Sequence, residues 1–66
     1  MDVEITRFVG GRSDGTELWK GFPAEPVQQH AKLIVETGLA DRVEVRDMAD
    51  RLVFQWPRTV RGTKGQ

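Results

Sequence analysis

One helical stripe, set between two pairs of alternating segments, constrains the fold of this chain more than any other feature. Apolar residues stand at i, i+4, i+7 and i+8 in the middle of the sequence, at Val27, Ala31, Ile34 and Val35. This spacing puts them on one side of an amphipathic helix, which we expect over residues 26–37. Gly38 should then end the helix in a Schellman cap, with Leu39 folded back toward the last turn.

Two segments on each side of this helix alternate apolar and polar residues, which is the period of a β-strand. The segments before the helix cover residues 3–9 and 16–22, and we interpret the glycine-rich stretch between them as a hairpin loop. In the register that best matches apolar residues, Phe8 lies opposite Trp19. The segments after the helix cover residues 42–46 and 52–56, with a turn between them.

These elements predict a single two-layer α+β domain of the order ββαββ over residues 1–56, with one helix covering one face of a four-stranded, mainly antiparallel sheet. The simplest arrangement joins two hairpins through the helix and places the first and last strands parallel at the centre. That topology is similar to the small β-grasp or protein-G-like folds, although other strand orders remain open and the analogy implies nothing about function. Because the 66 residues include no cysteine, packing rather than disulfides has to hold the domain together.

Charge is unevenly distributed along the chain, although the formal net charge is zero. Residues 57–66 carry Arg58, Arg61 and Lys64 and no acidic residue, so this segment has a charge of +3 and the rest of the chain −3. We predict that it forms a flexible basic tail after the domain. Two interpretations of the tail remain open: a solubilising end, or a nucleic-acid-binding arm whose three cations neutralise phosphates.

The sequence assembles no catalytic or metal-binding constellation. His30 is the only imidazole, and since no nucleophile signature accompanies it, we interpret it as a residue at the edge of the helical stripe rather than a general base. Asp47 and Asp50 bracket the expected turn, where aspartate commonly accepts backbone hydrogen bonds, and two carboxylates are too few for a hard cation. We therefore expect no enzyme, no metal and no cofactor.

The sheet face away from the helix provides the leading functional hypothesis. With Ile5 and Leu18 facing the helix, Phe8, Trp19 and Val53 would lie on the opposite face among charged residues. Apolar side chains ringed by charge are typical of an interface core with a polar rim, but isolated exposed side chains or a plain Phe8–Trp19 cross-strand pair would look the same.

We therefore expect a small protein-interaction module that binds or modulates a larger partner protein or associates with itself. The second strand would also offer an exposed edge to a partner strand. Nucleic-acid binding through the tail is the alternative hypothesis.

The composition bears on location and source. No apolar run approaches the ~20 residues of a membrane span, and the absence of cysteine fits a reducing cytoplasm. Arginine exceeds lysine, and asparagine and tyrosine are absent, which is typical of GC-rich genomes. In size and composition the chain resembles many short proteins of bacteria and their phages.

Overall fold

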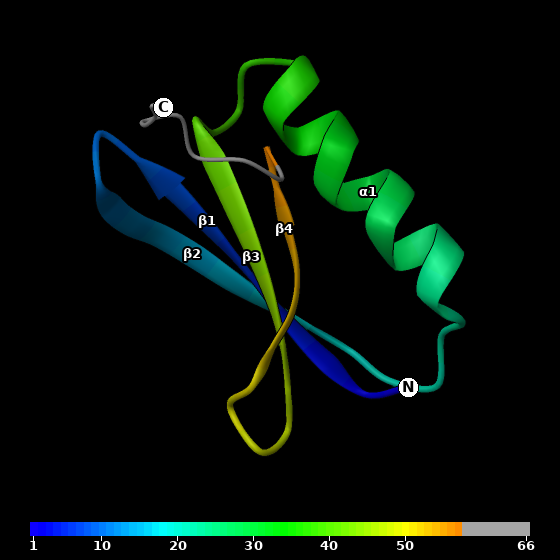
Figure 1. The fold of residues 1–66 in the computed structure, drawn as a ribbon. Coiled ribbons are helices and arrows are strands. Elements are labelled where there is room, and N and C mark those ends of the chain that lie inside the picture. Colours follow the sequence, from blue (N-terminus) through cyan, green and yellow to red (C-terminus); the bar gives the residue numbers. More distant parts are fainter. Residues whose placement is uncertain (58–66) are drawn as a thin grey trace, which may run out of the picture.

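The chain forms a four-stranded antiparallel sheet with one helix on one face, in a computed structural model that describes residues 1–57 (Figure 1). The elements are β1 (Val3–Val9), β2 (Arg12–Trp19), α1 (Ala24–Glu36), β3 (Arg42–Asp47) and β4 (Leu52–Trp56). Their order and their two layers are those predicted. Most of the expected basic tail, from residue 58 onward, lies outside the described residues.

The core consists of apolar side chains between α1 and the two inner strands. The buried residues are Val3, Ile5, Val43 and Val45 from the sheet, Val27, Ala31 and Ile34 from α1, and Ala40 from the connection that follows it. Trp19, Val35 and Phe54 pack at its margin. No polar or charged side chain within residues 1–57 is fully buried, so apolar burial, at about 0.8 kcal/mol per methylene, provides the main stabilisation.

Helix α1 ends in the predicted Schellman cap. The N–H of Gly38 donates to the carbonyl of Val35, and the N–H of Leu39 donates to the carbonyl of Ile34, each at 3.0 Å. Gly38 has a φ of 83°, the left-handed conformation that this cap requires. The side chain of Leu39 is 65% exposed, so backbone hydrogen bonds rather than apolar burial close this helix end.

The strand order is not that of the β-grasp-like arrangement, which was the simplest of the orders that the sequence left open. The sheet has the order β2-β1-β3-β4, and β1 pairs antiparallel with β3 rather than parallel with β4. The cause is the short connection after α1, in which the N–H of Asp41 donates to the carbonyl of Phe8 at 2.9 Å. The Asp41 carboxylate also accepts from the N–H of Gly10 at 2.7 Å. These two bonds fix the start of β3 beside the end of β1, so β4 becomes an edge strand.

The register of the first hairpin also differs from the prediction. Its loop is a two-residue turn at Gly10 and Gly11, whose φ angles of 60° and 83° are both positive, as a type I′ hairpin turn requires. Strand β2 therefore begins at Arg12, and Val3 rather than Phe8 lies opposite Trp19. A bulge at Asp14 and Gly15, opposite Arg7, shifts the pairing by one further residue, so beyond it the two registers differ by an odd number and the side chains of residues 16–19 lie on the other face of the sheet. Trp19 consequently faces α1, and Leu18 faces away from it.

Candidate functional site

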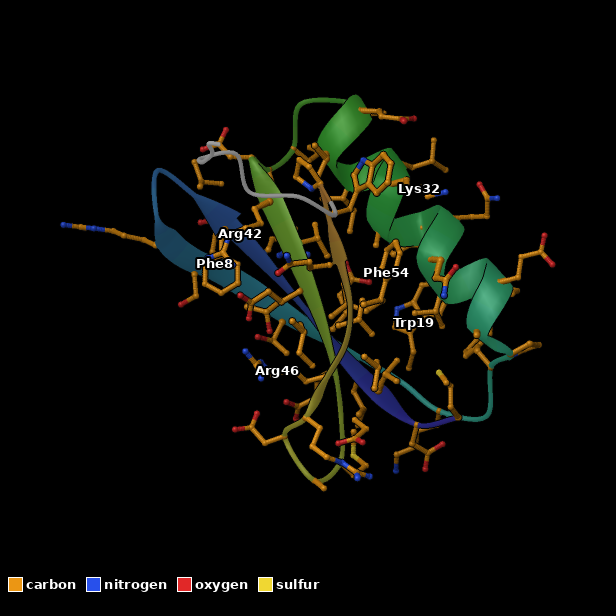
Figure 2. The ribbon with its side chains drawn as sticks, viewed as in Figure 1. Phe8, Trp19, Lys32, Arg42, Arg46 and Phe54 are labelled. Atoms are coloured by element: carbon orange, nitrogen blue, oxygen red, sulfur yellow. The ribbon has the colours of Figure 1, made fainter. Side chains whose placement is uncertain are left out.

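The structure does not bring the three predicted protein-binding residues together. Phe8 lies on the face away from α1, Trp19 lies between the sheet and α1, and Val53 lies in the edge strand β4 (Figure 2). The predicted common face is therefore wrong, because the bulge at Asp14 and Gly15 turns the following residues of β2, Trp19 included, to the other face of the sheet.

The face away from α1 is occupied by paired charges. The guanidinium of Arg42 lies over the Phe8 ring, 4.1 Å from its centroid, and also hydrogen-bonds to Glu44. Arg46 donates to the same Glu44 carboxylate at 3.0 Å. Phe8 is thus covered by a cation and half-buried, and the exposed Leu18 and Leu52 lie on opposite edge strands, Leu52 opposite Arg46. This face lacks the apolar centre that the sequence indicated.

Trp19 belongs to a polar network that links β2 to α1. Its indole N–H donates to Oε1 of Glu17 at 3.0 Å, and Nε2 of His30 lies 3.1 Å from the same oxygen. Arg7 donates to the other carboxylate oxygen at 2.8 Å. The hydrogen bond from Trp19 is the main cause that holds the pKa of Glu17 below its ordinary value, aided by His30 and Arg7 against partial desolvation.

This network changes the interpretation of His30, for which no neighbour in the sequence offers a partner. The first hairpin places Glu17 beside the imidazole of His30 on the helix side of the sheet, and the centroids of the Trp19 and His30 rings lie 4.6 Å apart. Both oxygens of the Glu17 carboxylate already accept hydrogen bonds from protein groups. The contact between His30 and Glu17 links α1 to β2. No group of three metal-ligating side chains occurs within residues 1–57.

The second hairpin is held by the aspartate that the sequence assigned to its turn. The Asp47 carboxylate accepts hydrogen bonds from the N–H groups of Ala49 and Arg51 at 2.9 and 3.0 Å, and it also pairs with the Arg51 guanidinium. The hydrogen bond from the Arg51 backbone is the main cause that lowers the pKa of Asp47. Asp50 takes the left-handed position of the turn, with a φ of 64°. Asp47 and Asp50 thus stabilise the turn, which is the role expected of them from the sequence.

An open groove lies along strand β4, and it is the candidate site. Its volume is about 500 Å³. Five residues line it: Gln28 from α1, and Leu52, Val53, Phe54 and Gln55 from β4. Because Val45 pairs with Phe54 and Arg46 with Leu52, Val53 is an extra residue that forms a bulge. Simple alternation along β4 would place Leu52 on the helix side with Phe54 and Trp56, but the bulge sets Leu52 opposite Arg46, and Leu52 and Val53 are 45% and 43% exposed.

The upper end of β4 is packed more tightly. Phe54 and Trp56 face the helix side, opposite Val45 and Val43, with their rings parallel within 9° and their centroids 6.4 Å apart. The ammonium group of Lys32 lies 4.9 Å from the centroid of the Trp56 ring. Helix α1 therefore flanks the whole strand, with Gln28 beside its first half and Lys32 beside its end.

The two edges of the sheet differ in charge. Strand β2 contains Arg12, Asp14 and Glu17, and its bulge at Asp14 and Gly15 is crossed by the Arg7 side chain. Charges and bulges are common means of preventing an edge strand from pairing with another chain. Strand β4, with the sequence LVFQW, contains no charged residue. Of the two edges, β4 is the one whose composition permits a further strand to pair with it.

The cations of the alternative hypothesis, Arg58, Arg61 and Lys64, lie outside the described residues. Within residues 1–57, no helix is long and apolar enough to cross a membrane. Comparison with known proteins finds no matching family model, no matching curated protein and no matching solved structure.

Proposed function

We propose that this protein is a small protein-interaction module that binds an extended segment of a partner along the edge of β4. The observation that supports it is the groove of about 500 Å³ between Gln28 and residues 52–55, beside a strand that has a neighbour on one side only within the described chain. In strand addition, main-chain hydrogen bonds provide affinity, and pockets for alternate side chains provide specificity. Strand β4 offers both features.

The proposal retains Val53 as a binding residue and removes Phe8 and Trp19. Val53 is 43% exposed in the groove, whereas Phe8 is covered by Arg42 and Trp19 is engaged with Glu17 and His30. A binding role is favoured over catalysis because the imidazole of His30 is already engaged in the network around Glu17. A cytoplasmic location belongs to the proposal, supported by the absence of cysteine.

A display library of unstructured peptides, selected on the full chain, tests this function. Val53→Lys adds a charge to the groove, and Leu18→Lys is the matched control, because Leu18 is an equally simple exposed aliphatic residue on the other edge strand. We expect peptides that bind the wild type and the control but not Val53→Lys. Their addition should shift the amide NMR signals of Gln28 and of residues 52–55. Peptides that bind Val53→Lys equally well, or that shift the signals of β2, would refute the assignment to β4.

Nucleic-acid binding is the second candidate, favoured by the segregation of +3 charge in residues 57–66 from −3 in the rest of the chain. Anisotropy of labelled DNA and RNA, titrated with the full chain at low and physiological salt, measures it. A phosphate-driven complex should weaken steeply as salt rises, and replacing Arg58, Arg61 and Lys64 with glutamine should abolish it. Binding that persists in the triple variant would refute this role of the tail.

A further inference from the structure

We infer that Asp14 and Gly15 form a self-modification site, at which Asp14 converts to isoaspartate with the help of Arg7. The main-chain nitrogen of Gly15 attacks Cγ of Asp14, its proton and a hydroxyl of the protonated carboxyl group leave as water, and a succinimide ring closes. A solvent water then adds to the former main-chain carbonyl of Asp14 and breaks the bond from that carbon to nitrogen. The peptide bond now runs through Cγ, the main-chain carbonyl has become a carboxylate, and the mass is unchanged.

The first observation in support is that the attacked carboxyl group is accessible and unengaged. Asp14 is exposed, and its side chain has no hydrogen-bond or ion-pair partner among the residues that the structure describes. The carboxyl group is therefore free to rotate toward the next N–H group. Three other aspartates, by contrast, accept hydrogen bonds from main-chain N–H groups: Asp2 from Gly21, Asp41 from Gly10, and Asp47 from Ala49 and Arg51.

The second observation is that the nucleophile belongs to a glycine in a bulge. Asp14 is the one aspartate in the chain that precedes a glycine, so no side chain shields the attacking nitrogen. In a regular strand the pleat directs each side chain out of the sheet and away from the following N–H. Asp14 and Gly15 together lie opposite Arg7, and Gly15 has a φ of 133°. The bulge therefore removes the regular strand geometry that would keep Cγ away from the nitrogen.

The third observation is the position of Arg7. Its Nη2 donates to the main-chain carbonyl of Asp14 at 3.2 Å, and this carbonyl belongs to the same peptide group as the attacking nitrogen of Gly15. A cation at the carbonyl makes that N–H easier to deprotonate. It also polarises the carbonyl that water attacks, which directs ring opening toward isoaspartate. The carboxylate released there already lies beside the guanidinium and forms a charge-assisted hydrogen bond with it.

The product affects the network around Trp19 through Arg7. Nη1 of Arg7 donates to one oxygen of Glu17 at 2.8 Å, and the indole N–H of Trp19 donates to the other oxygen at 3.0 Å. The new carboxylate competes with Glu17 for the guanidinium, while the main chain of β2 becomes longer by one methylene group. Isomerisation should therefore shift the NMR signals of the Glu17 amide and of the Trp19 indole N–H.

Incubation of the full chain near neutral pH, followed by trypsin cleavage and mass spectrometry, measures the reaction. Trypsin cuts after Arg12 and Lys20 and releases residues 13–20. The isoaspartate form of this peptide has the same mass but a different chromatographic retention, and electron-transfer fragmentation locates the rearranged bond. Asp14→Glu is the matched control, because it keeps the charge but cannot close the succinimide ring.

Comparison of folded and unfolded chains assigns the reaction to the fold. We expect the native wild type to form isoaspartate faster than the same chain in urea, and Asp14→Glu to form none in residues 13–20. Arg7→Ala should lower the native rate by about tenfold, the loss of one hydrogen bond to a charged group, but should leave the rate in urea unchanged. Amide NMR spectra show whether Arg7→Ala has kept the fold.

Arg7→Lys is the second variant, since it keeps the positive charge but lacks the planar donor fork. Its native rate should lie between those of the wild type and Arg7→Ala. A native wild type that reacts more slowly than the chain in urea would show that the fold protects Asp14 and would overturn the inference. Equal native rates for the wild type, Arg7→Lys and Arg7→Ala would overturn the role of Arg7.

Discussion

Replacing Gly15 with alanine should destabilise the fold, because the Arg7 side chain occupies the space that a Cβ at Gly15 would need. A Cβ built on Gly15 would lie 2.1 Å from Nη2 of Arg7, far inside contact distance. The backbone at Gly15 also has a φ of 133°, a conformation that residues with a side chain rarely adopt. Gly15→Ala should therefore raise the free energy of the folded state in two separable ways.

The first contribution comes from the displaced guanidinium. The end of an arginine side chain can swing away, but it then loses the 2.8 Å ion pair with Glu17 and the 3.2 Å hydrogen bond to the carbonyl of Asp14. Arg7 and Glu17 are 27% and 35% exposed, so solvent screening limits their ion pair. We expect the two bonds together to contribute about 0.5–1.5 kcal/mol.

The second contribution is backbone strain, which does not depend on Arg7. A residue held in a sparsely populated φ region costs about 1–3 kcal/mol. The sum, about 1.5–4.5 kcal/mol, is comparable with the roughly 3–5 kcal/mol that a domain of this size has in total. Unfolding should therefore be measured in a fixed concentration of sucrose, which favours the folded state.

A double-mutant cycle separates the two contributions. Urea unfolding, followed by tryptophan fluorescence, gives the free energy of unfolding of the wild type, Gly15→Ala, Arg7→Ala and the double variant. Gly15→Ala should cost about 0.5–1.5 kcal/mol less in the Arg7→Ala background, since the guanidinium is already gone. Equal costs in both backgrounds would show that Arg7 does not occupy this position. A cost near zero in both would refute the backbone geometry as well.

Three further predictions follow from the core, the Glu17 network and the second turn. Ile5 is completely buried, so Ile5→Val should lower the free energy of unfolding by about 0.5–1.5 kcal/mol and Ile5→Ala by about 2–5 kcal/mol in urea titrations, whereas a smaller loss for Ile5→Ala would contradict its place in the core. The pKa of Glu17 is lower in the folded state, so the ionised carboxylate stabilises the fold fully above the unfolded-state pKa, and this stabilisation is lost as pH falls through the folded-state pKa. Lowering the pH should therefore reduce the free energy of unfolding of the wild type more than that of Glu17→Gln. The same pH dependence in both proteins would contradict this. Asp50 has a φ of 64°, so Asp50→Val should lower the melting temperature, with a cost of about 1–2 kcal/mol, while Asp50→Gly leaves it nearly unchanged; equal effects would argue against the left-handed turn.

Local patterns predicted the elements of this fold well. The helix was expected over residues 26–37 and forms from Ala24 to Glu36, and the last two strands agree with prediction to within one residue. Each of these segments has a regular apolar period and a clear end signal, such as Gly38 after the helix. Such information lies within a few residues of chain, so it can be read without knowing the partners across the sheet.

The strand order and the first hairpin depended on Asp41, which is distant in sequence from the turn that it stabilises. Its carboxylate holds Gly10, 31 residues earlier, and its N–H holds Phe8. The stretch between residues 10 and 15 contains three glycines, so a two-residue turn and a longer loop were both compatible with the sequence. Within the same stretch, the bulge at Asp14 and Gly15 turns the end of β2 to the other face, and with it the environment of Trp19.

The candidate site was predicted only in part, for a similar reason. Val53 was assigned to binding, but its position in a groove depends on the bulge opposite Arg46, and the periodicity of β4 gives no sign of that bulge. Gln28 lies outside the apolar stripe of the helix, and it becomes part of the groove because β4 lies at the edge beneath α1. Both facts follow from the strand order, which the local pattern did not determine.

The distribution of charge over the two edges connects this fold to the proposed function. The inner strands β1 and β3 bury their valine and isoleucine side chains whichever strands flank them, so the core places little demand on the composition of β2 and β4. Strand β2 nevertheless carries charges and a bulge crossed by Arg7, while β4 is uncharged and lies beside an open groove. An uncharged free edge exposes a chain to unwanted pairing, and edge strands are commonly protected against it. Protection of one edge alone is what a domain requires if the other edge has a partner.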